Sequence, residues 1–332
     1  MRFPLSLNLS LTSYLLKNKL SSNGRYPIVL MLEPTHACNL SCEGCGRIRE
    51  YGESLKESMS VEECLTSVEE SNTPIVTITG GEPLMYPHID QLVRELIKRK
   101  RHIYLCTNGI LLKGSLHKLI PNTCLNINVH LDGLSVTHDR ISGRTGVFKE
   151  AVNGIKKAKE MGFRVCTNTS IYKDTDMDEI EALFAYLDYL KVDGMSVAPA
   201  FGYEAVDNDI FLSRDDIHQR FRHIYHLSKR FKIINTPLYL KFLRGDRDLC
   251  CTPWGNPTRN PQGWKSPCYL ITDTHYPTFR ELMEKTEWEK YGNGNDPRCS
   301  NCMMHCGFEP TVVREVGNRL SDIWEMIVWN LS

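Results

Sequence analysis

The sequence predicts an α/β fold: a partial barrel of six parallel strands and their helices, (βα)6, with an irregular, cysteine-rich C-terminal extension. The first observation is that strand-like and helix-like apolar patterns alternate six times before residue 200. The second is that cysteine-rich, glycine-rich and polar motifs follow the ends of these strands, where barrel enzymes place their chemistry. Six strands are too few for a closed eight-stranded barrel, so we expect a partial barrel or an open sheet.

The expected strands are short apolar and β-branched runs. They cover 27–33, 75–78, 103–106, 125–131, 164–171 and 194–198. Apolar residues at helical spacing fill the gaps between them, and Ser60 with Glu63 forms a capping box at the start of the first helix. One more helix is expected around 217–224. The Pro-, Gly- and Trp-rich stretch 251–269 is expected to be an ordered, irregular loop.

Four parts of the chain are expected to differ in role. They are an N-terminal appendage at 1–26, the barrel at 27–235, the cysteine-rich extension at 236–316 and an amphipathic helix at 317–332. The appendage is rich in leucine, and we favour its covering the barrel bottom over membrane contact aided by Lys17 and Lys19. For the apolar stripe of the last helix, we favour packing onto the body over contact with a membrane or a partner.

Charge and composition exclude several classes of protein. Lys and Arg number 40, as do Asp and Glu, so the basic excess typical of a nucleic-acid-binding protein is missing. The longest apolar run is too short to span a membrane, and the first residues are a poor signal peptide. We therefore expect a cytoplasmic protein, at most peripheral on the inner membrane face. The 13 cysteines are odd in number and clustered, which favours metal binding or catalysis over a disulfide framework.

The first cluster of cysteines follows the first expected strand. Cys38, Cys42 and Cys45 have C-x3-C-x2-C spacing. Thiolates are ligands for zinc or iron–sulfur clusters, which ordinarily take four protein ligands. Three thiolates close together leave one iron of a cubane free to bind a substrate. The alternative is a structural zinc site with a distant fourth ligand.

This spacing, together with Gly80-Gly81-Glu82-Pro83 after the second strand, resembles the radical S-adenosylmethionine (SAM) superfamily. The resemblance implies a 4Fe–4S cluster on the three cysteines, whose open iron binds SAM, and a glycine-rich turn that contacts the SAM amino group. Gly44 departs from the family pattern, because many members carry an aromatic residue before the third cysteine that touches the adenine.

The resemblance also implies which side chains face SAM. The expected cofactor-binding residues are Gly80, Gly81, Glu82, Asn108, His130, Asp132 and Asn168. The charged set His138, Asp139, Arg140 and Arg144 follows the same strand as Asp132, and it could equally be a solvated loop with surface ion pairs. Asn168 could instead bond its own backbone.

A narrower resemblance extends over residues 10–312, to the adenosylhopane synthases of hopanoid biosynthesis. The segments that carry it are Tyr26-Pro27, Met31 to Pro34, Cys45-Gly46, Tyr104 to Asn108, His130 to Gly133, Cys251 to Asn260 and Cys302 to Pro310. The most specific is Cys-Thr-Pro-Trp-Gly-Asn-Pro-Thr-Arg-Asn. Cys250 and the tail from about 317 lie outside the pattern.

That resemblance implies an adenosyltransferase of lipid metabolism. An electron from the cluster would cleave SAM to methionine and a 5′-deoxyadenosyl radical, which would add to the terminal alkene of hopene (diploptene) and give adenosylhopane. The implied partners are a polyprenoid alkene and an electron-donating flavodoxin or ferredoxin. The alternative function is a radical SAM enzyme that abstracts hydrogen from another substrate and releases 5′-deoxyadenosine. A non-catalytic metal-binding or electron-transfer protein would have no use for the glycine-rich turn.

Five further cysteines predict a second metal site of open identity. They are Cys251, Cys268, Cys299, Cys302 and Cys306. An auxiliary 4Fe–4S cluster, a structural zinc and free buried thiols are the three interpretations.

Cys106 is the expected catalytic residue. Strand alternation puts Tyr104, Cys106 and Asn108 on one face, near the strand end where barrel sites are built. A small buried hydrophobic residue is the alternative role. The resemblance assigns it to quenching the substrate radical, because it falls on the position that the family uses for this step.

Overall fold

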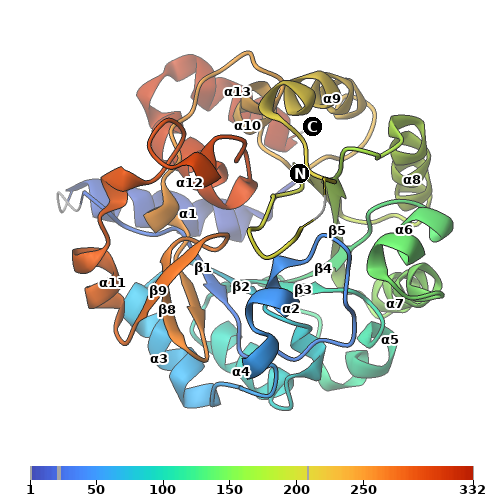
Figure 1. The fold of residues 1–332 in the computed structure, drawn as a ribbon, viewed down its shortest axis with the longest axis horizontal. Coiled ribbons are helices and arrows are strands. Elements are labelled where there is room, and N and C mark those ends of the chain that lie inside the picture. Colours follow the sequence, from blue (N-terminus) through green and yellow to red (C-terminus); the bar gives the residue numbers. More distant parts are fainter. Residues whose placement is uncertain (1, 21–23, 208, 332) are drawn as a thin grey trace.

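The computed structural model describes residues 2–20, 24–207 and 209–331. Within these residues nine strands form one sheet in the order β6-β5-β4-β3-β2-β1-β7-β8-β9 (Figure 1). The first six are β1 (Val29–Leu32), β2 (Ile75–Ile78), β3 (His102–Thr107), β4 (Leu125–His130), β5 (Arg164–Ile171) and β6 (Gly194–Pro199). Each pairs in parallel with the next. The expected partial barrel of six parallel strands is confirmed.

Helices cover the outer face of this sheet and follow the predicted alternation (Figure 1). They include α3 (Val61–Ser71), α4 (Ile89–Lys98), α5 (Leu112–Ser115), α6 (Ser135–Ser142), α7 (Val147–Glu160), α8 (Met177–Tyr189) and α9 (Arg214–Leu227). The capping box of Ser60 and Glu63 begins α3 as expected. Leu30 and Leu32 of β1 belong to the main apolar core. Met31 and Glu33 alternate with them and therefore point to the inner face of the barrel.

The extension continues the sheet, so the prediction of an irregular loop over 251–269 is wrong where that stretch forms strands, at 258–260 and 263–267. β7 (Thr258–Asn260) pairs in parallel with β1, and β8 (Gly263–Pro267) and β9 (Thr272–Tyr276) follow it in antiparallel fashion. Gly263, one of the residues whose type suggested a loop, begins β8 with φ +137°. β7 pairs the edge of β1 that the six-stranded sheet would leave open.

Short helices complete the extension and the cysteine loops. They are α2 (Gly46–Glu50), α10 (Pro237–Leu243), α11 (Phe279–Lys285) and α12 (His305–Glu315). Figure 1 shows α2 in front of the sheet, whereas α10 and α12 lie to one side of it, next to α13 (Leu320–Leu331). The hairpin β8–β9 lies between these two groups, so it joins the barrel to the extension.

A helix from each end of the chain packs on the body. α1 (Leu5–Leu20) places Leu7, Leu11 and Leu15 against Ile28 and Ile75, at the starts of β1 and β2. The expectation that the appendage covers the barrel bottom is thus confirmed. No helix among the described residues is long and apolar enough to cross a membrane.

The last helix, α13 (Leu320–Leu331), turns its apolar stripe away from the body, opposite to the prediction. Its apolar stripe was expected to face the body, but Leu320, Trp324 and Leu331 are exposed. The physical reason is a polar interface: Asp322 is buried against Arg247, and Glu325 pairs with Lys241 of α10. These ion pairs turn the apolar stripe outward.

Candidate functional site

The loop between β1 and α2 carries the three clustered cysteines. Cys38, Cys42 and Cys45 are free thiols, each half-buried. Burial raises the pKa of Cys38 to about 11 and also raises the pKa of Cys42, and the neighbouring cysteines add to both shifts. A bound cationic cluster would offset this cost and stabilise the thiolate forms of Cys38 and Cys42.

The glycine-rich turn after β2 is bonded directly to this loop. The Gly81 N–H donates to Thr35 O at 3.1 Å, and the Glu82 N–H donates to Ala37 O at 2.7 Å. A Cβ on Gly81 would lie 2.1 Å from Ala37 O, so only glycine permits this approach. The turn and the cysteine loop therefore form one rigid unit.

Glu82 ties this unit to β3 and does not point toward a ligand. Its carboxylate accepts bonds from the Thr107 hydroxyl at 2.7 Å, from the Asn108 N–H at 2.8 Å and from the Leu84 N–H at 3.0 Å. Burial raises its pKa even against these bonds. Asn108 in turn donates to Asn39, next to Cys38, at 2.8 Å. Both carboxylate oxygens of Glu82 therefore accept hydrogen bonds from within the protein.

A polar row crosses the ends of β4, β5 and β6. His130 Nε2 lies 2.7 Å from Asp132 Oδ2, the other ring nitrogen lies 3.1 Å from Asn168 Nδ2, and Ser196 bonds Asn168 Oδ1 at 3.0 Å. The Ser170 N–H also donates to Asp132, at 2.7 Å. Asn168 therefore bonds side chains rather than its own backbone, which corrects the alternative role considered for it.

The charge of this row is set by the His130–Asp132 pair. Burial opposes both charges, yet each partner stabilises the other: the pKa of His130 is raised and that of Asp132 is lowered. His138 is buried behind them, accepts the Asp132 N–H at 3.1 Å, and has its pKa lowered to about 4 by burial. A neutral ring behind a charged pair fixes the pair's position at the barrel mouth.

The other charged residues after β4 have structural partners. Asp139 accepts the N–H groups of Gly146 and Phe148, at the start of α7. Arg140 is exposed and pairs with Glu43 at 3.3 Å and Asp174 at 2.7 Å. The solvated-loop interpretation therefore fits Asp139 and Arg140 better than a ligand-binding one.

Two thiols lie in one row inside the barrel. The strand registers place Cys106 beside Asn128 and Asn128 beside Cys166, so the three side chains point to the same face. Asn128 Nδ2 lies 3.7 Å from Cys106 Sγ. Burial raises the pKa of each thiol to about 11, so both are protonated at neutral pH.

An aromatic ring fills the place left by Gly44. A Cβ on Gly44 would lie 2.7 Å from the ring of Tyr172, which follows β5 and is buried. The aromatic group beside the third cysteine is thus supplied from another part of the chain. Sequence reasoning missed Tyr172, because its closeness to Gly44 arises only from the fold.

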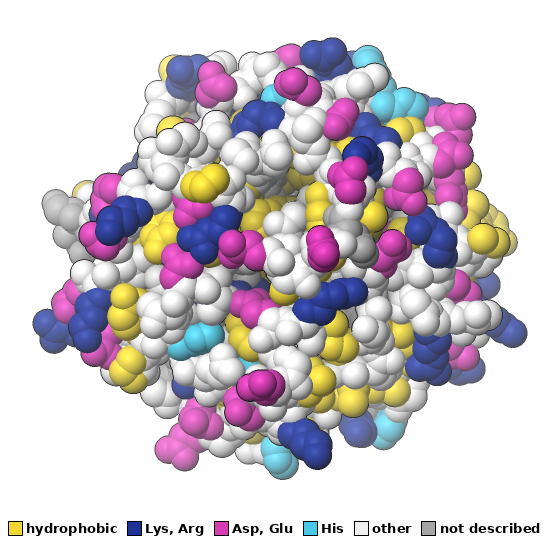
Figure 2. Space-filling model, in the orientation of Figure 1, with side chains coloured by type: hydrophobic (Ala, Val, Ile, Leu, Met, Phe, Trp, Pro, Cys, Tyr) yellow, Lys and Arg dark blue, Asp and Glu magenta, His cyan; other side chains and the backbone are white. Residues whose placement is uncertain are grey.

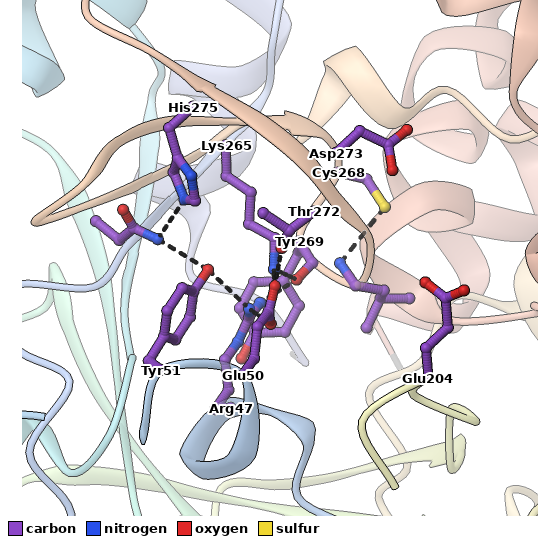
Figure 3. A network of polar contacts seen from close by, with 12 residues as sticks. Arg47, Glu50, Tyr51, Glu204, Lys265, Cys268, Tyr269, Thr272, Asp273 and His275 are labelled. Atoms are coloured by element: carbon purple, nitrogen blue, oxygen red, sulfur yellow. Dashed lines mark hydrogen bonds and ion pairs between the residues drawn. The ribbon is translucent and has the colours of Figure 1, made fainter. Parts of the chain in front are cut away.

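A buried ionic network joins the first cysteine loop to the extension (Figure 3). Arg47 of α2 pairs with Glu33 and Glu50, both at 3.0 Å, and its guanidinium lies 4.1 Å from the Tyr269 ring centroid. Lys265 of β8 is fully buried and lies 3.2 Å from both Glu50 oxygens. Burial lowers the pKa of Lys265 to about 8. The positions of Arg47, Glu50 and Lys265 in the sequence do not indicate that these side chains meet in the fold.

The five cysteines of the extension converge from separate segments. Cys268, Cys299, Cys302 and Cys306 share one small core with Phe201, Leu270 and Ile271. Cys251 lies against α12, where a Cβ on Gly307 would be 2.4 Å from its sulfur. Burial raises the pKa of Cys302 to about 12, and the neighbouring thiols reinforce the shift. Cys250 is exposed, in keeping with its place outside the pattern.

Neither cysteine set has the geometry of a single-ion site. Among the described residues, no three His, Cys, Asp or Glu side chains are placed to share one metal ion. Thiolates around a cubane stand further apart than those around one zinc ion, because the cluster itself lies between them. This arrangement is compatible with a cluster at the first set, and at the second set it is compatible with a cluster or with free thiols.

The face that carries the cysteine loop is electrically mixed. Figure 2 shows acidic and basic side chains interspersed over it, with hydrophobic side chains between them. No stripe of one sign runs across this view, in line with the equal numbers of acidic and basic residues.

Two regions of the chain match known protein families. Residues 32–187 match the sequence profile of the radical SAM superfamily. These residues are a radical SAM domain. Such a domain uses a 4Fe–4S cluster and SAM, and the three-thiol loop with its glycine turn fits both. Residues 195–326 match a domain of unknown function, DUF3463, which covers the second cysteine set.

Curated relatives match mainly the radical SAM domain. The sporulation killing factor maturation protein SkfB of Bacillus subtilis is 29% identical over 53% of this chain and 41% of its own length. A GTP 3′,8-cyclase of Thermodesulfovibrio yellowstonii is 32% identical over 55% of this chain and 60% of its own length. The chain thus spans about half the length of these relatives.

Solved structures share the fold. Streptococcus suis SuiB bound to S-adenosylmethionine is 17% identical with a TM-score of 0.61, over 75% of this chain and 61% of that one. anSMEcpe with bound AdoMet is 16% identical with a TM-score of 0.59, over 92% of this chain and 97% of that one. The match to anSMEcpe covers enough of the chain to include part of the C-terminal extension. None of the relatives and structures named above is a hopanoid adenosyltransferase, and their likeness supports the radical SAM domain without a specific substrate.

Proposed function

We propose that this radical SAM enzyme is an adenosyltransferase that joins the 5′-deoxyadenosyl group of SAM to the terminal alkene of a polyprenoid, hopene (diploptene), and forms adenosylhopane. The observation that carries the proposal is Cys106. It lies inside the barrel next to Asn128, as a protonated thiol, at the end of β3. An addition reaction needs such a hydrogen donor to finish it.

We assign the cofactor to the residues of the cysteine loop and the polar row. Cys38, Cys42 and Cys45 would hold the 4Fe–4S cluster, which supplies the electron that cleaves SAM. The backbone of Gly80 and Gly81 would contact the SAM amino group. The polar side chains nearest the barrel mouth are then those of His130, Asp132 and Asn168. Two further residues, Asn108 and Glu82, would act by holding the cysteine loop in place.

Cys106 has the chemistry that the last step requires. Adding the adenosyl carbon to the terminal alkene carbon forms one carbon–carbon bond and leaves an unpaired electron on the tertiary carbon. A thiol S–H bond is weaker than the C–H bond that replaces it, so hydrogen transfer from Cys106 is favourable. Because burial raises the pKa of this thiol to about 11, the hydrogen is present at neutral pH.

The thiyl radical left on Cys106 must be reduced before the next turnover. One electron from a flavodoxin or ferredoxin and one proton from solvent restore the thiol and balance the reaction. A second 4Fe–4S cluster on four of Cys251, Cys268, Cys299, Cys302 and Cys306 is part of the proposal, because these thiols converge in one buried region. Its test is the iron content of variants.

A second function is favoured by different observations. The inner face of the barrel carries Asn126, Asn128, Asn168 and Ser196, a polar lining that suits a polar substrate. SkfB is named for the maturation of a sporulation killing factor, and GTP 3′,8-cyclase for a nucleotide substrate. An enzyme of this kind would abstract hydrogen from a polar substrate and release 5′-deoxyadenosine.

Product analysis separates the two functions. The reconstituted enzyme is incubated anaerobically with SAM, a reductant and diploptene, and the products are identified by mass spectrometry. The proposal predicts a covalent adenosyl–polyprenoid adduct in amounts that match methionine release. Free 5′-deoxyadenosine equal to methionine, with no adduct from diploptene, would contradict it and favour hydrogen abstraction.

A further inference from the structure

The two terminal helices form one neighbouring pair on the surface. At one end, Phe3 N–H donates to the Asn330 side chain at 2.7 Å, and the rings of Phe3 and Trp329 are 5.4 Å apart. At the other end, the Lys19 ammonium lies beside Gly317, 3.3 Å from where a Cβ would stand. Helix α1 therefore runs antiparallel to α13, and Figure 1 shows the two chain ends close together.

Helix α1 carries two leucine stripes rather than one. Leu7, Leu11 and Leu15 pack against the barrel bottom. Leu5, Leu9, Leu16 and Leu20 recur at helical spacing on the other side, and all are exposed, Leu20 by 85%. A surface helix that only covered a barrel would carry polar residues there. Among the described residues, no packing partner covers this outer stripe.

Helix α13 repeats the arrangement. Leu320, Trp324, Ile327, Val328 and Leu331 lie along its outer face, with Trp324 exposed by 68%. Its inner face is fixed by the Arg247–Asp322 and Lys241–Glu325 ion pairs. Because both helices turn their other side to the body, the two exposed stripes form one outward apolar surface, which we call the terminal-helix surface. Contiguous exposed apolar patches of this kind mark interaction sites.

Charge narrows the choice of partner. Helix α1 contains no acidic residue, and Lys17 and Lys19 form no ion pair with any described residue. The two acidic residues of α13 are already paired with Arg247 and Lys241. The surface is thus apolar with uncompensated basic residues at one end and an exposed tryptophan. This composition is typical of helices that lie in the plane of an anionic lipid leaflet.

We propose that the terminal-helix surface binds anionic membranes, with α1 and α13 lying in the headgroup region and Lys17 and Lys19 facing the lipid phosphates. The inference stands on the surface alone and does not depend on the reaction proposed above. It would place the barrel bottom, which α1 covers, against the bilayer.

Vesicle flotation tests the proposal. The full-length protein is mixed with phosphatidylcholine vesicles, with or without an equal part of phosphatidylglycerol, in the absence of SAM. We expect flotation with the anionic vesicles that weakens with salt. Leu9→Ser with Trp324→Ser should reduce the affinity by tenfold or more, and Lys17→Gln with Lys19→Gln should reduce it about fivefold per lysine, on anionic vesicles only.

The matched control replaces exposed apolar residues elsewhere. Ile120→Ser with Tyr189→Ser removes two side chains that are 69% and 78% exposed, and it should leave flotation unchanged. Circular dichroism checks that all variants fold. Absence of flotation with either vesicle would overturn the proposal. So would a dimer, seen in sedimentation velocity without lipid, that the Leu9→Ser and Trp324→Ser changes dissociate, because the surface would then bind a second copy.

Discussion

The two cysteine sets are built in opposite ways. Cys38, Cys42 and Cys45 lie in one loop and number three, whereas the five of the extension come from the segments around Cys251, Cys268, Cys299–Cys302 and Cys306. Three thiols in one loop leave a cluster with an open position for a substrate. Five thiols collected by tertiary structure can close a site completely. The first arrangement is suited to chemistry, and the second to holding the extension together.

A third element connects them, the buried Arg47–Glu50–Lys265 network. Arg47 follows Cys45 by two residues, and Lys265 precedes Cys268 by three. Charges buried in this way are costly to leave unpaired, about 3–5 kcal/mol when one partner is removed. The network therefore couples the position of the first loop to that of the second set.

The largest effect is expected at the first loop. Replacing Cys38, Cys42 and Cys45 by Ala should abolish SAM cleavage while the fold persists, because the three side chains are only half-buried. The measurement is methionine release under anaerobic conditions, with iron content and circular dichroism alongside. Cys250→Ala, which removes an exposed thiol, should keep full activity. Methionine release that survives in the triple variant would end the radical SAM account of this loop.

The second set should respond in yield more than in chemistry. Cys299→Ala with Cys302→Ala is expected to lower the iron content to that of one cluster and to lower the yield of folded protein. The rate of SAM cleavage per folded molecule should fall less. Iron analysis, soluble yield and methionine release measure the three quantities. If iron and yield both stay at wild-type levels, the extension holds no second cluster.

The network should affect stability without removing either set. Lys265→Met removes one of the two cationic partners of the partly buried Glu50 and leaves Arg47 in place, and we expect a loss of about 1–3 kcal/mol in the free energy of unfolding. Denaturant titration of the anaerobic protein measures it. Lys285→Met, which breaks an exposed pair with Glu281, is the control and should leave stability unchanged. An equal effect of both changes would show that the Lys265 pair is no stronger than a surface one.

The smallest effect concerns α13 and depends on pH. Hydrogen bonds from Arg247 hold the pKa of Asp322 below its usual range, so this ion pair stabilises the docked helix above the ordinary aspartate pKa. Its contribution is lost as the pH falls through the lowered value. The protection of α13 amides, measured relative to their intrinsic exchange rate at each pH, should therefore fall on acidification, and Asp322→Asn should make this protection low and less sensitive to pH. High protection in this variant at every pH would mean that other contacts fix the helix.

Much of the barrel could be predicted because local patterns and tertiary structure agree there. The alternation of strands and helices, the capping box of Ser60 and Glu63, and the three-cysteine spacing are all local in sequence. The β7–β8 hairpin was missed, because its Gly263 and Pro261 signal a turn but not the strands beside it. The outward stripe of α13 was missed because ion pairs with Arg247 and Lys241, far away in sequence, decide which face is buried.

The candidate site shows the same division. The cysteines and the glycine turn could be predicted from the sequence, because their spacing along the chain is itself the motif. Tyr172 against Gly44 and the Arg47–Lys265 network could not, because they join residues from separate elements and carry no periodic signal. Asp139 and Arg140 were considered as ligands for their charge, but that charge serves the α7 N-terminus and a surface ion pair.

The central claim is that Cys106 delivers the final hydrogen, and Cys166 offers the matched comparison in the same row of the barrel. Both thiols are buried with pKa values raised to about 11, and each is replaced by Ala in turn. The decisive measurement is mass spectrometry of the adduct formed from diploptene. We predict that Cys166→Ala still gives the saturated adduct, whereas Cys106→Ala cleaves SAM but gives only unsaturated or diverted adducts. Normal amounts of saturated adduct from Cys106→Ala would contradict the account.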